Sequence, residues 1–356
     1  MQATLERIRS WGCNTLGLGT TEDFLGHGMF FIETVGFRQA APETVIKLAG
    51  ALLPDVFDPR WSAGCDEIAA MVCNTRRASR ELVGYCTDQG LQWSQPPDAT
   101  KPLRPARPSL LQICLSLEPS FPAYHAAWEF VLAPHGGELA SLTKAWGIDA
   151  NKEALRQLTL TDVPLSTVGY LEDQERFSRE FAHRYFQTCA AAIRRFDPNH
   201  LVLGCTFETP PGSAILSEAV SPAVDLLAVH ANNVALYETV GAYARDTGLP
   251  VFLTDFSWAN ESFATAKLDR RRLTTVERML ANGRATMTRA FAHPALVGYS
   301  WSSWADLPDD VAPPFAQGLV HTDDSEAREH TELLTELNLR AEALRCSAGA
   351  RPNSSS

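Results

Sequence analysis

The chain has 356 residues, of which 45% are hydrophobic and 21% are charged, and its formal net charge is -11. An acidic chain without a basic stripe is a poor candidate for nucleic-acid binding, so we expect no nucleic-acid partner. Length and composition suit one large globular domain, because α/β barrels reach about 250 residues or more as a single unit.

The eight cysteines are spread through the chain, and none forms a Cys-x-x-Cys pair or a Cys/His cluster with zinc spacing. We therefore expect no metal and no cofactor. Residues 1–11 predict a charged amphipathic helix rather than a signal peptide. No apolar run approaches the roughly 20 residues that span a membrane. These features favour a cytoplasmic protein without a membrane partner, and homo-oligomerisation is left open.

Strand-like apolar runs alternate with helical patterns along the chain. The runs are 13–18, 29–35, 82–87, 201–207, 226–230, 251–256 and 296–301, and the clearest helical patterns are 63–74, 177–196, 237–247 and 273–292. Strand, helix and strand at this spacing predict a parallel sheet with right-handed crossovers. Helix 177–196 ends at Asp197-Pro198-Asn199-His200, which is a stop signal before the next strand.

Residues 94–169 interrupt this alternation. The segment begins rich in proline and then becomes helical in pattern, and it is too long for a plain loop. A disordered linker is the alternative. Apolar side chains argue against a linker: Leu110, Leu111, Ile113, Trp128, Phe130 and Trp146. We predict that this segment is a helical cap inserted over the top face of a single domain of residues 1–350, followed by a disordered tail, 351–356.

Five short motifs occur along the chain in an order that indicates a protein family. They are Ser-Trp-Gly-Cys-Asn-Thr-Leu-Gly at 10–17, Pro-Asp-Val-Phe-Asp-Pro-Arg at 54–60, the helix-strand unit 181–204, Gly-Tyr-Ser-Trp at 298–301 with Asp306, and Gln-Gly-Leu-Val at 317–320 with Asp323. Together they resemble β-agarase- and β-galactosidase-like glycoside hydrolases. The resemblance implies an α/β fold, a TIM-type (β/α)8 barrel. In that family a strand precedes the helix at residues 1–11, so the first strand is either missing or lies before the given residues.

Two further stretches resemble the strand ends that carry the catalytic glutamates of that family. They are 82–93, where the family typically reads Asp-Asn-Glu-Leu, and 250–258, where it reads Thr-Glu-Phe or Gly-Glu-Phe. By this resemblance the glutamates fall on Gly90 and Asp255. A retaining glycosidase needs two carboxyl groups about 5.5 Å apart. Gly90 supplies none and Asp255 is one methylene short, so the ordinary two-glutamate mechanism is not expected.

Other catalytic candidates accompany Asp255 at the ends of predicted strands. Asp88 stands two residues before Gly90, although an aspartate there often caps the following loop. Glu208 closes the run 201–207, and its alternative role is a surface carboxylate. His230 ends the run 226–230, where a lone histidine is often structural. Because barrel enzymes place their sites at the C-terminal ends of strands, we expect all four to converge there with Trp301.

Aromatic side chains follow the same strand ends. Indole rings stack on the apolar faces of pyranose rings, while neighbouring polar groups fix the hydroxyls. The substrate-binding candidates are Trp93, Trp258, Trp301, Trp304, Asn14 and Asn232. The alternative for the tryptophans is packing of the barrel rim.

Three functional interpretations remain open, and whether the chain is an enzyme depends on which holds. The first is a diverged glycoside hydrolase that acts on a saccharide or glycoside. The second is a non-catalytic pseudo-glycosidase that binds a saccharide or a protein. The third is a barrel redirected to biosynthetic acid/base chemistry, such as a lyase, cyclase or isomerase, that uses Asp255. Fold analogy does not decide between them, because the barrel hosts many chemistries.

Overall fold

The computed structural model describes residues 1–48, 51–91, 93, 108–149, 151, 155, 167–207, 211–267, 273–307 and 316–349. Its helices are α1 (Gln2–Ser10), α2 (Pro59–Arg76), α3 (Leu110–Ser116), α4 (Pro122–Leu132), α5 (Leu139–Ala145), α7 (Val168–Phe196), α8 (Ser213–Ile215), α9 (Leu236–Thr247), α10 (Glu261–Thr265), α11 (Thr275–Phe291) and α12 (Arg328–Gly349). Its strands are β1 (Thr15–Leu16), β2 (Phe30–Thr34), β3 (Val45–Ile46), β4 (Leu53–Pro54), β5 (Leu82–Cys86), β6 (Leu201–Gly204), β7 (Leu227–His230), β8 (Val251–Phe256), β9 (Leu296–Trp301), β10 (Ser303–Ala305) and β11 (Gly318–Val320).

The alternation of strands and helices read from the sequence is confirmed. Each predicted strand run contains a strand, and the runs 251–256 and 296–301 match β8 and β9 residue for residue. The sequence did not indicate β3, β4, β10 and β11, which are two or three residues long. The chain therefore has an α/β fold, and its strands form small sheets.

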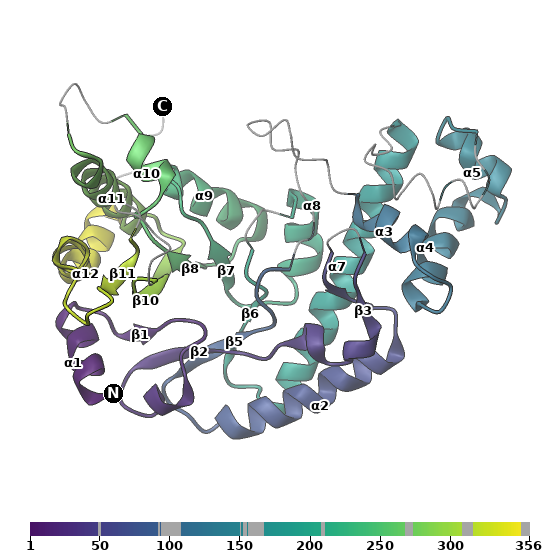
Figure 1. The fold of residues 1–356 in the computed structure, drawn as a ribbon. Coiled ribbons are helices and arrows are strands. Elements are labelled where there is room, and N and C mark those ends of the chain that lie inside the picture. The colour runs from purple at the N-terminus through teal and green to yellow at the C-terminus, as the bar shows by residue number, and fades with distance from the viewer. Residues whose placement is uncertain are drawn as a thin grey trace. The chain divides into compact units, whose positions relative to one another are not determined.

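The chain forms two compact units (Figure 1). The first comprises Met1–Thr34, Ser79–Gly84 and Asp225–Ser356, and the second comprises Val35–Ala78 and Tyr85–Val224. Strand β5 begins in the first unit and ends in the second. In the first unit the amide of Phe31 on β2 donates to the carbonyl of Glu81, just before β5. In the second unit the amide of Thr87, just after β5, donates to the carbonyl of Gly204 on β6.

A parallel sheet of β7, β8 and β9 is the centre of the first unit. Its strands are buried on both faces, as the successive residues Ala228 and Val229 of β7 illustrate at 0% exposure. Near-continuous apolar runs are typical of parallel strands that helices cover. Helices α9 and α11 connect the three strands, and α10 and α12 pack against α11 (Figure 1). Helix α11 begins at a reciprocal capping box formed by Thr274 and Glu277.

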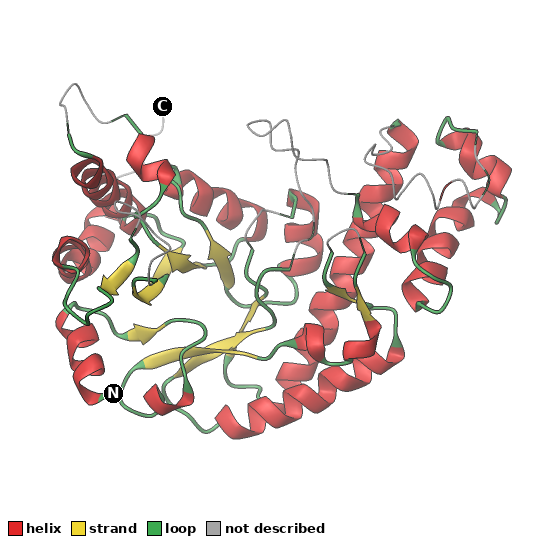
Figure 2. Cartoon of the chain, in the orientation of Figure 1, coloured by secondary structure: helices red, strands yellow, loops and turns green. Residues whose placement is uncertain are grey.

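The second unit is built mainly from helices (Figure 2), with α2 and α7 packed side by side. Residue Gly64 of α2 permits a close approach, because a Cβ atom there would lie 2.1 Å from the carbonyl oxygen of Ala40. The indole of Trp61 on α2 donates to the carbonyl of Phe37 and stacks on Tyr185 of α7. Large buried aromatic side chains thus form the core of this unit.

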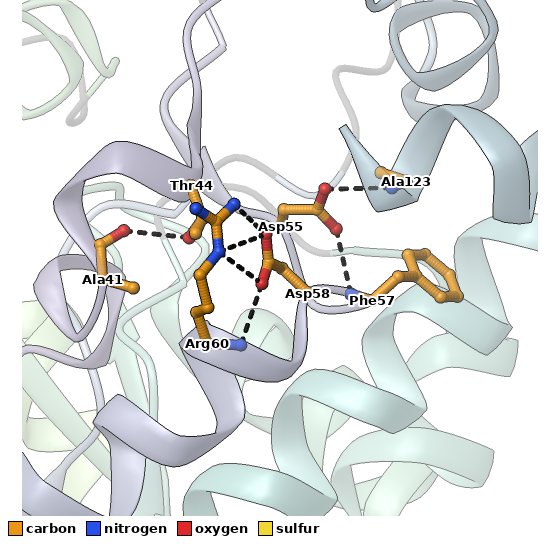
Figure 3. Close-up of polar contacts among 7 residues, drawn as sticks. All are labelled: Ala41, Thr44, Asp55, Phe57, Asp58, Arg60 and Ala123. Atoms are coloured by element: carbon orange, nitrogen blue, oxygen red, sulfur yellow. Dashed lines mark hydrogen bonds and ion pairs between the residues drawn. The ribbon is translucent and has the colours of Figure 1, made fainter. Parts of the chain in front are cut away.

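Two aspartates of the motif 54–60 organise the start of two helices (Figure 3). The Asp58 carboxylate caps α2 by accepting from the amide of Arg60, and it also binds the Arg60 guanidinium. The Asp55 carboxylate accepts from the amides of Phe57 and of Ala123, which lies in the first turn of α4. The motif therefore joins α2 and α4, which are far apart in the sequence.

The described part of the predicted insertion, 94–169, contains α3, α4 and α5 and the first residues of α7. Its apolar side chains are packed: Leu111 and Trp146 are 0% and 1% exposed, and Phe130 lies 5.4 Å from Phe177 between ring centroids. The Trp146 indole donates to the carboxylate of Asp173. These helices belong to the core of the second unit, whereas residues 94–107 lie outside the described residues.

Candidate functional site

An irregularity near the end of β8 sets the geometry of the candidate site. Leu253 pairs with Tyr299 and Phe256 pairs with Trp301, so Thr254 and Asp255 on β8 face Ser300 alone on β9. Two residues opposite one is a β-bulge, which locally re-aims side chains. Asp255 takes up the distortion with φ of +51°, a left-handed conformation that Asp tolerates better than most residues. Its amide donates to Ser300 Oγ over 3.3 Å.

His230 is brought beside Asp255 by the register of the neighbouring strands. It ends β7 and pairs with Thr254, the residue before Asp255. Its Nδ1 lies 4.0 Å from Asp255 Oδ2, and the two side chains are 36% and 39% exposed. At this distance the contact is electrostatic rather than a hydrogen bond. A carboxylate and an imidazole that both reach solvent can exchange protons with a bound molecule.

Asn232 connects the ends of β7 and β8. Its Nδ2 donates to the carbonyl of Asp255 over 3.0 Å, and its Oδ1 accepts from the amide of Ser257 over 3.0 Å. The same Nδ2 lies 3.4 Å from His230 Nε2. The structure therefore brings three of the sequence-predicted residues together: His230, Asn232 and Asp255.

Of the first unit's three predicted tryptophans, Trp258 is a core residue. It is 0% exposed, its indole donates to His330 Nδ1, and its ring lies 4.6 Å from that of Trp301 between centroids. A Cβ atom at Gly283 would come within 2.9 Å of the Trp258 ring, so α11 packs directly on it. Trp258 thus presents no ring face to solvent, which fits the packing alternative.

Trp301 and Trp304 are both half-buried. The Trp301 indole donates to the carbonyl of Gln317 over 2.7 Å. Trp304 packs on Trp11, with ring centroids 5.8 Å apart, and the guanidinium of Arg7 lies 5.4 Å from its centroid. Both rings keep some surface for a ligand, and both are fixed in place by protein contacts.

Asn14 is exposed and precedes β1. Its carbonyl accepts from the amide of Phe30 on β2, and its side-chain oxygen accepts from the hydroxyl of Thr15. The local contacts thus anchor the start of β1, and they leave part of the Asn14 side chain in solvent.

Asp88 lies in the second unit and is 2% exposed. Both of its carboxylate oxygens accept from the amide of Arg38, and Oδ2 also accepts from the Tyr185 hydroxyl over 2.6 Å. Burial raises the pKa of Asp88 to about 6, against the opposing effect of the Tyr185 hydrogen bond. These contacts match the structural alternative, in which the carboxylate holds the chain after β5. We therefore leave Asp88 out of the proposed site.

Trp93 also lies in the core of the second unit. It is 3% exposed, its indole donates to Cys205 Sγ, and its ring packs 5.0 Å from that of Tyr185. Gly90 has φ of +66°, and its amide donates to Thr206 Oγ1. A side chain at residue 90 would be strained in this conformation. Glu208 lies outside the described residues. The predicted convergence of all these residues stays a prediction.

Ser300 is a contact that the sequence interpretation missed. It is 6% exposed and occupies the place opposite the bulge, where its hydroxyl accepts from the Asp255 amide. A Cβ atom at Gly17 would lie 3.3 Å from Ser300 Cβ, so the small residue after β1 leaves space for it. The motif 298–301 contained Ser300, but a strand pattern alone does not reveal which neighbour a bulge brings opposite.

Among the described residues, no group of three or more His, Cys, Asp or Glu side chains is arranged to hold a metal ion. The described helices include none with both the length and the apolar character needed to cross a membrane.

Comparisons with known proteins place this geometry in context. No family model matches the chain. It is 23% identical over 322 residues to β-agarase A of Vibrio sp. (strain JT0107), an alignment that covers 86% of this chain and 32% of that protein. The chain thus spans about a third of this curated relative.

Solved structures of similar fold bear names of the same kind. An exo-β-agarase superposes with a TM-score of 0.74 at 18% identity, over 97% of this chain and 47% of that one. The agarase AgWH50C gives a TM-score of 0.71 at 18% identity, over 97% and 49% of the two chains. The β-galactosidase of the psychrophilic Marinomonas ef1 gives 0.59 at 15% identity, over 98% and 58%. The chain therefore has a glycoside hydrolase-like fold.

Proposed function

We propose that this chain acts on a saccharide or glycoside, with Asp255 as its working carboxylate, in a diverged (β/α)8-type barrel. The observation that carries the proposal is the strained conformation of Asp255 at the β8 bulge. Non-glycine residues in such conformations cost of order 1–3 kcal/mol and cluster at functional sites. The relatives are named agarases and β-galactosidases, so galactosides and agar oligosaccharides are the first substrates to test.

In this mechanism Asp255 attacks or electrostatically stabilises the anomeric carbon as positive charge develops there. His230 faces the carboxylate, with its Nδ1 4.0 Å from Asp255 Oδ2. Trp301 and Trp304 supply ring surface for sugar stacking. By the resemblance to glycoside hydrolases, the usual acid falls on Gly90, which has no side chain. Departure of an unactivated leaving group should therefore be slow, because general acid catalysis is worth about 10²–10⁴ in rate.

The test is a screen of activated aryl glycosides, β-galactosides first, with and without azide. Activated leaving groups depart without a proton, so we expect turnover of these compounds and little turnover of unactivated saccharides. Azide should accelerate turnover, because it replaces water at the anomeric carbon without needing a base. Fast cleavage of unactivated saccharides, indifferent to azide, would show that a complete acid/base pair is present and would contradict this mechanism.

The pairing of a carboxylate with an imidazole favours one alternative, acid/base chemistry of the lyase, cyclase or isomerase kind. In that case saccharides or other small polar substrates should be converted without hydrolysis, and azide should have no effect. A non-catalytic binding module would instead bind saccharides without turning any of them over.

A further inference from the structure

The side-chain amide of Asn232 has an orientation that its backbone partners dictate. The amide of Ser257 is a donor, so the atom that faces it must be the oxygen of Asn232. The carbonyl of Asp255 is an acceptor, so the atom that faces it must be the nitrogen. Reversing the amide would place donor against donor and acceptor against acceptor. Two independent contacts therefore fix the amide, which a single contact leaves ambiguous.

This orientation determines which atom of Asn232 faces the His230 ring. The Nδ2 group of Asn232, a donor, lies 3.4 Å from Nε2 of the ring. A neutral imidazole has one donor nitrogen and one acceptor nitrogen. Nε2 must be the acceptor, because a hydrogen on Nε2 would point at the hydrogens of the Asn232 side-chain amide. The proton of neutral His230 then sits on Nδ1, the nitrogen that lies 4.0 Å from Asp255 Oδ2.

We infer that Asn232 is a positioning residue that fixes the tautomer of His230 and aims its Nδ1 proton at the Asp255 carboxylate. The same side chain holds the bulge itself, through the carbonyl of Asp255 and the amide of Ser257. The side-chain amide of Asn232 therefore determines which nitrogen of His230 carries the proton, and it also holds the backbone at Asp255. The chemical consequence rests on the proposed function, since it assumes that Asp255 works as a carboxylate.

The tautomer can be measured without any activity. The protein is labelled with ¹⁵N-histidine, and long-range ¹H–¹⁵N spectra are recorded at about pH 8, above the usual histidine pKa of about 6.5. The chain has nine histidines, so the His230 signals are assigned as those lost in His230→Gln. We expect Nδ1 to carry the proton and Nε2 to be bare. A wild-type ring with its proton on Nε2 would overturn the inference before any variant is made.

Variants at Asn232 test the cause. Asn232→Asp places an acceptor beside Nε2 and should move the proton to that nitrogen, and Asn232→Ala should remove the preference for Nδ1. The matched control is Asn260→Ala. Asn260 binds the same loop, through the carbonyl of Ser257 and the amide of Ser262, and these contacts involve neither His230 nor Asp255. The control should keep the wild-type tautomer. An unchanged tautomer in a folded Asn232→Ala protein would also overturn the inference.

Turnover of an activated aryl glycoside separates this inference from the proposed function. Asn232→Ala should lower kcat on the order of 10-fold or more with little change in KM, because the misplaced groups act on the reacting atoms. Asn260→Ala should keep the wild-type kcat. Wild-type protein with the expected tautomer and no conversion of any saccharide would defeat the proposed function alone. Turnover that depends on Asp255 in a protein with the opposite tautomer would defeat this inference alone.

Discussion

Asp255 combines a charged side chain with a backbone conformation that most residues avoid. Its φ of +51° is accessible to Asp and Asn, and less so to longer side chains such as Glu. A glutamate, which the resembling family typically has at this position, would thus be harder to accommodate here. The bulge places residue 255 at a positive φ, and aspartate, which is shorter than glutamate, tolerates that conformation better. Restoring a glutamate at residue 255 alone would conflict with the backbone.

The strain at Asp255 can be measured with two variants that both delete the carboxylate. Asp255→Gly should unfold with a free energy roughly 1 kcal/mol higher than Asp255→Ala, because only glycine adopts positive φ without a Cβ penalty. Denaturant titration of the two proteins measures the difference. Asp255→Asn serves as control and should stay close to the wild type, since Asn tolerates this conformation as Asp does. Equal stabilities of the Gly and Ala variants would show that residue 255 is unstrained.

Asp88 provides a pH-dependent prediction. Burial raises its pKa in the folded protein to about 6, from an ordinary value of 3.8. Between these values the folded state binds the proton more tightly than the unfolded state, so the contribution of Asp88 to stability falls as the pH rises through the window. The free energy of unfolding of the wild type minus that of Asp88→Asn should therefore decrease from about pH 4 to about pH 6 and level off outside this range. A difference that stays constant across the window would contradict the burial of Asp88.

At the scale of elements, several residues of the motifs that resemble glycoside hydrolases stabilise turns and strand ends. The Asp197 carboxylate accepts from the hydroxyl of Tyr85 and from the amides of Asn199 and His200, which shapes the turn between α7 and β6. The Asp306 carboxylate accepts from the amide of Gly318 at the start of β11. Sequence patterns located such residues well, because turn and cap positions have strong local preferences.

Substitution of Asp55 tests whether the motif 54–60 stabilises the start of α4. Asp55→Ala removes the acceptor of two amides, those of Phe57 and Ala123, and should lower the free energy of unfolding by about 3 kcal/mol, since unsatisfied buried donors cost roughly 1–3 kcal/mol each. Amide hydrogen exchange should accelerate in the first turn of α4. Asp58→Ala is the control, and its effect should fall on α2, the helix that Asp58 caps. Acceleration in α2 and not α4 on loss of Asp55 would refute this assignment.

The site was harder to predict than the elements. Apolar runs and helix signals located seven of the described strands, because hydrophobic periodicity and termination are local. The β8 bulge was not visible, since it depends on how β8 and β9 pair. Burial distinguished the predicted site residues that reach solvent from those that do not. Asp88, Trp93 and Trp258 follow the same patterns as His230, but tertiary contacts cover them.

At the scale of the whole molecule, the fold is glycoside hydrolase-like and the chemistry is a proposal. The chain spans about half of the agarase structures that it resembles. Within the first unit, the His230–Asp255 pair distinguishes the candidate site from a simple carboxylate pair. The proposed function therefore depends on whether Asp255 performs chemistry on a saccharide.

Turnover of activated aryl glycosides by wild-type protein and by Asp255→Asn tests this claim most directly. The substitution removes the charge and keeps a residue that tolerates positive φ, so the fold should be retained. We predict measurable wild-type turnover of at least one activated glycoside and a loss on the order of 10²-fold or more in Asp255→Asn, the scale on which misplacing a reacting group reduces the rate. Turnover that is undiminished by the substitution, or a wild-type protein that converts no saccharide or glycoside, would contradict the proposed function.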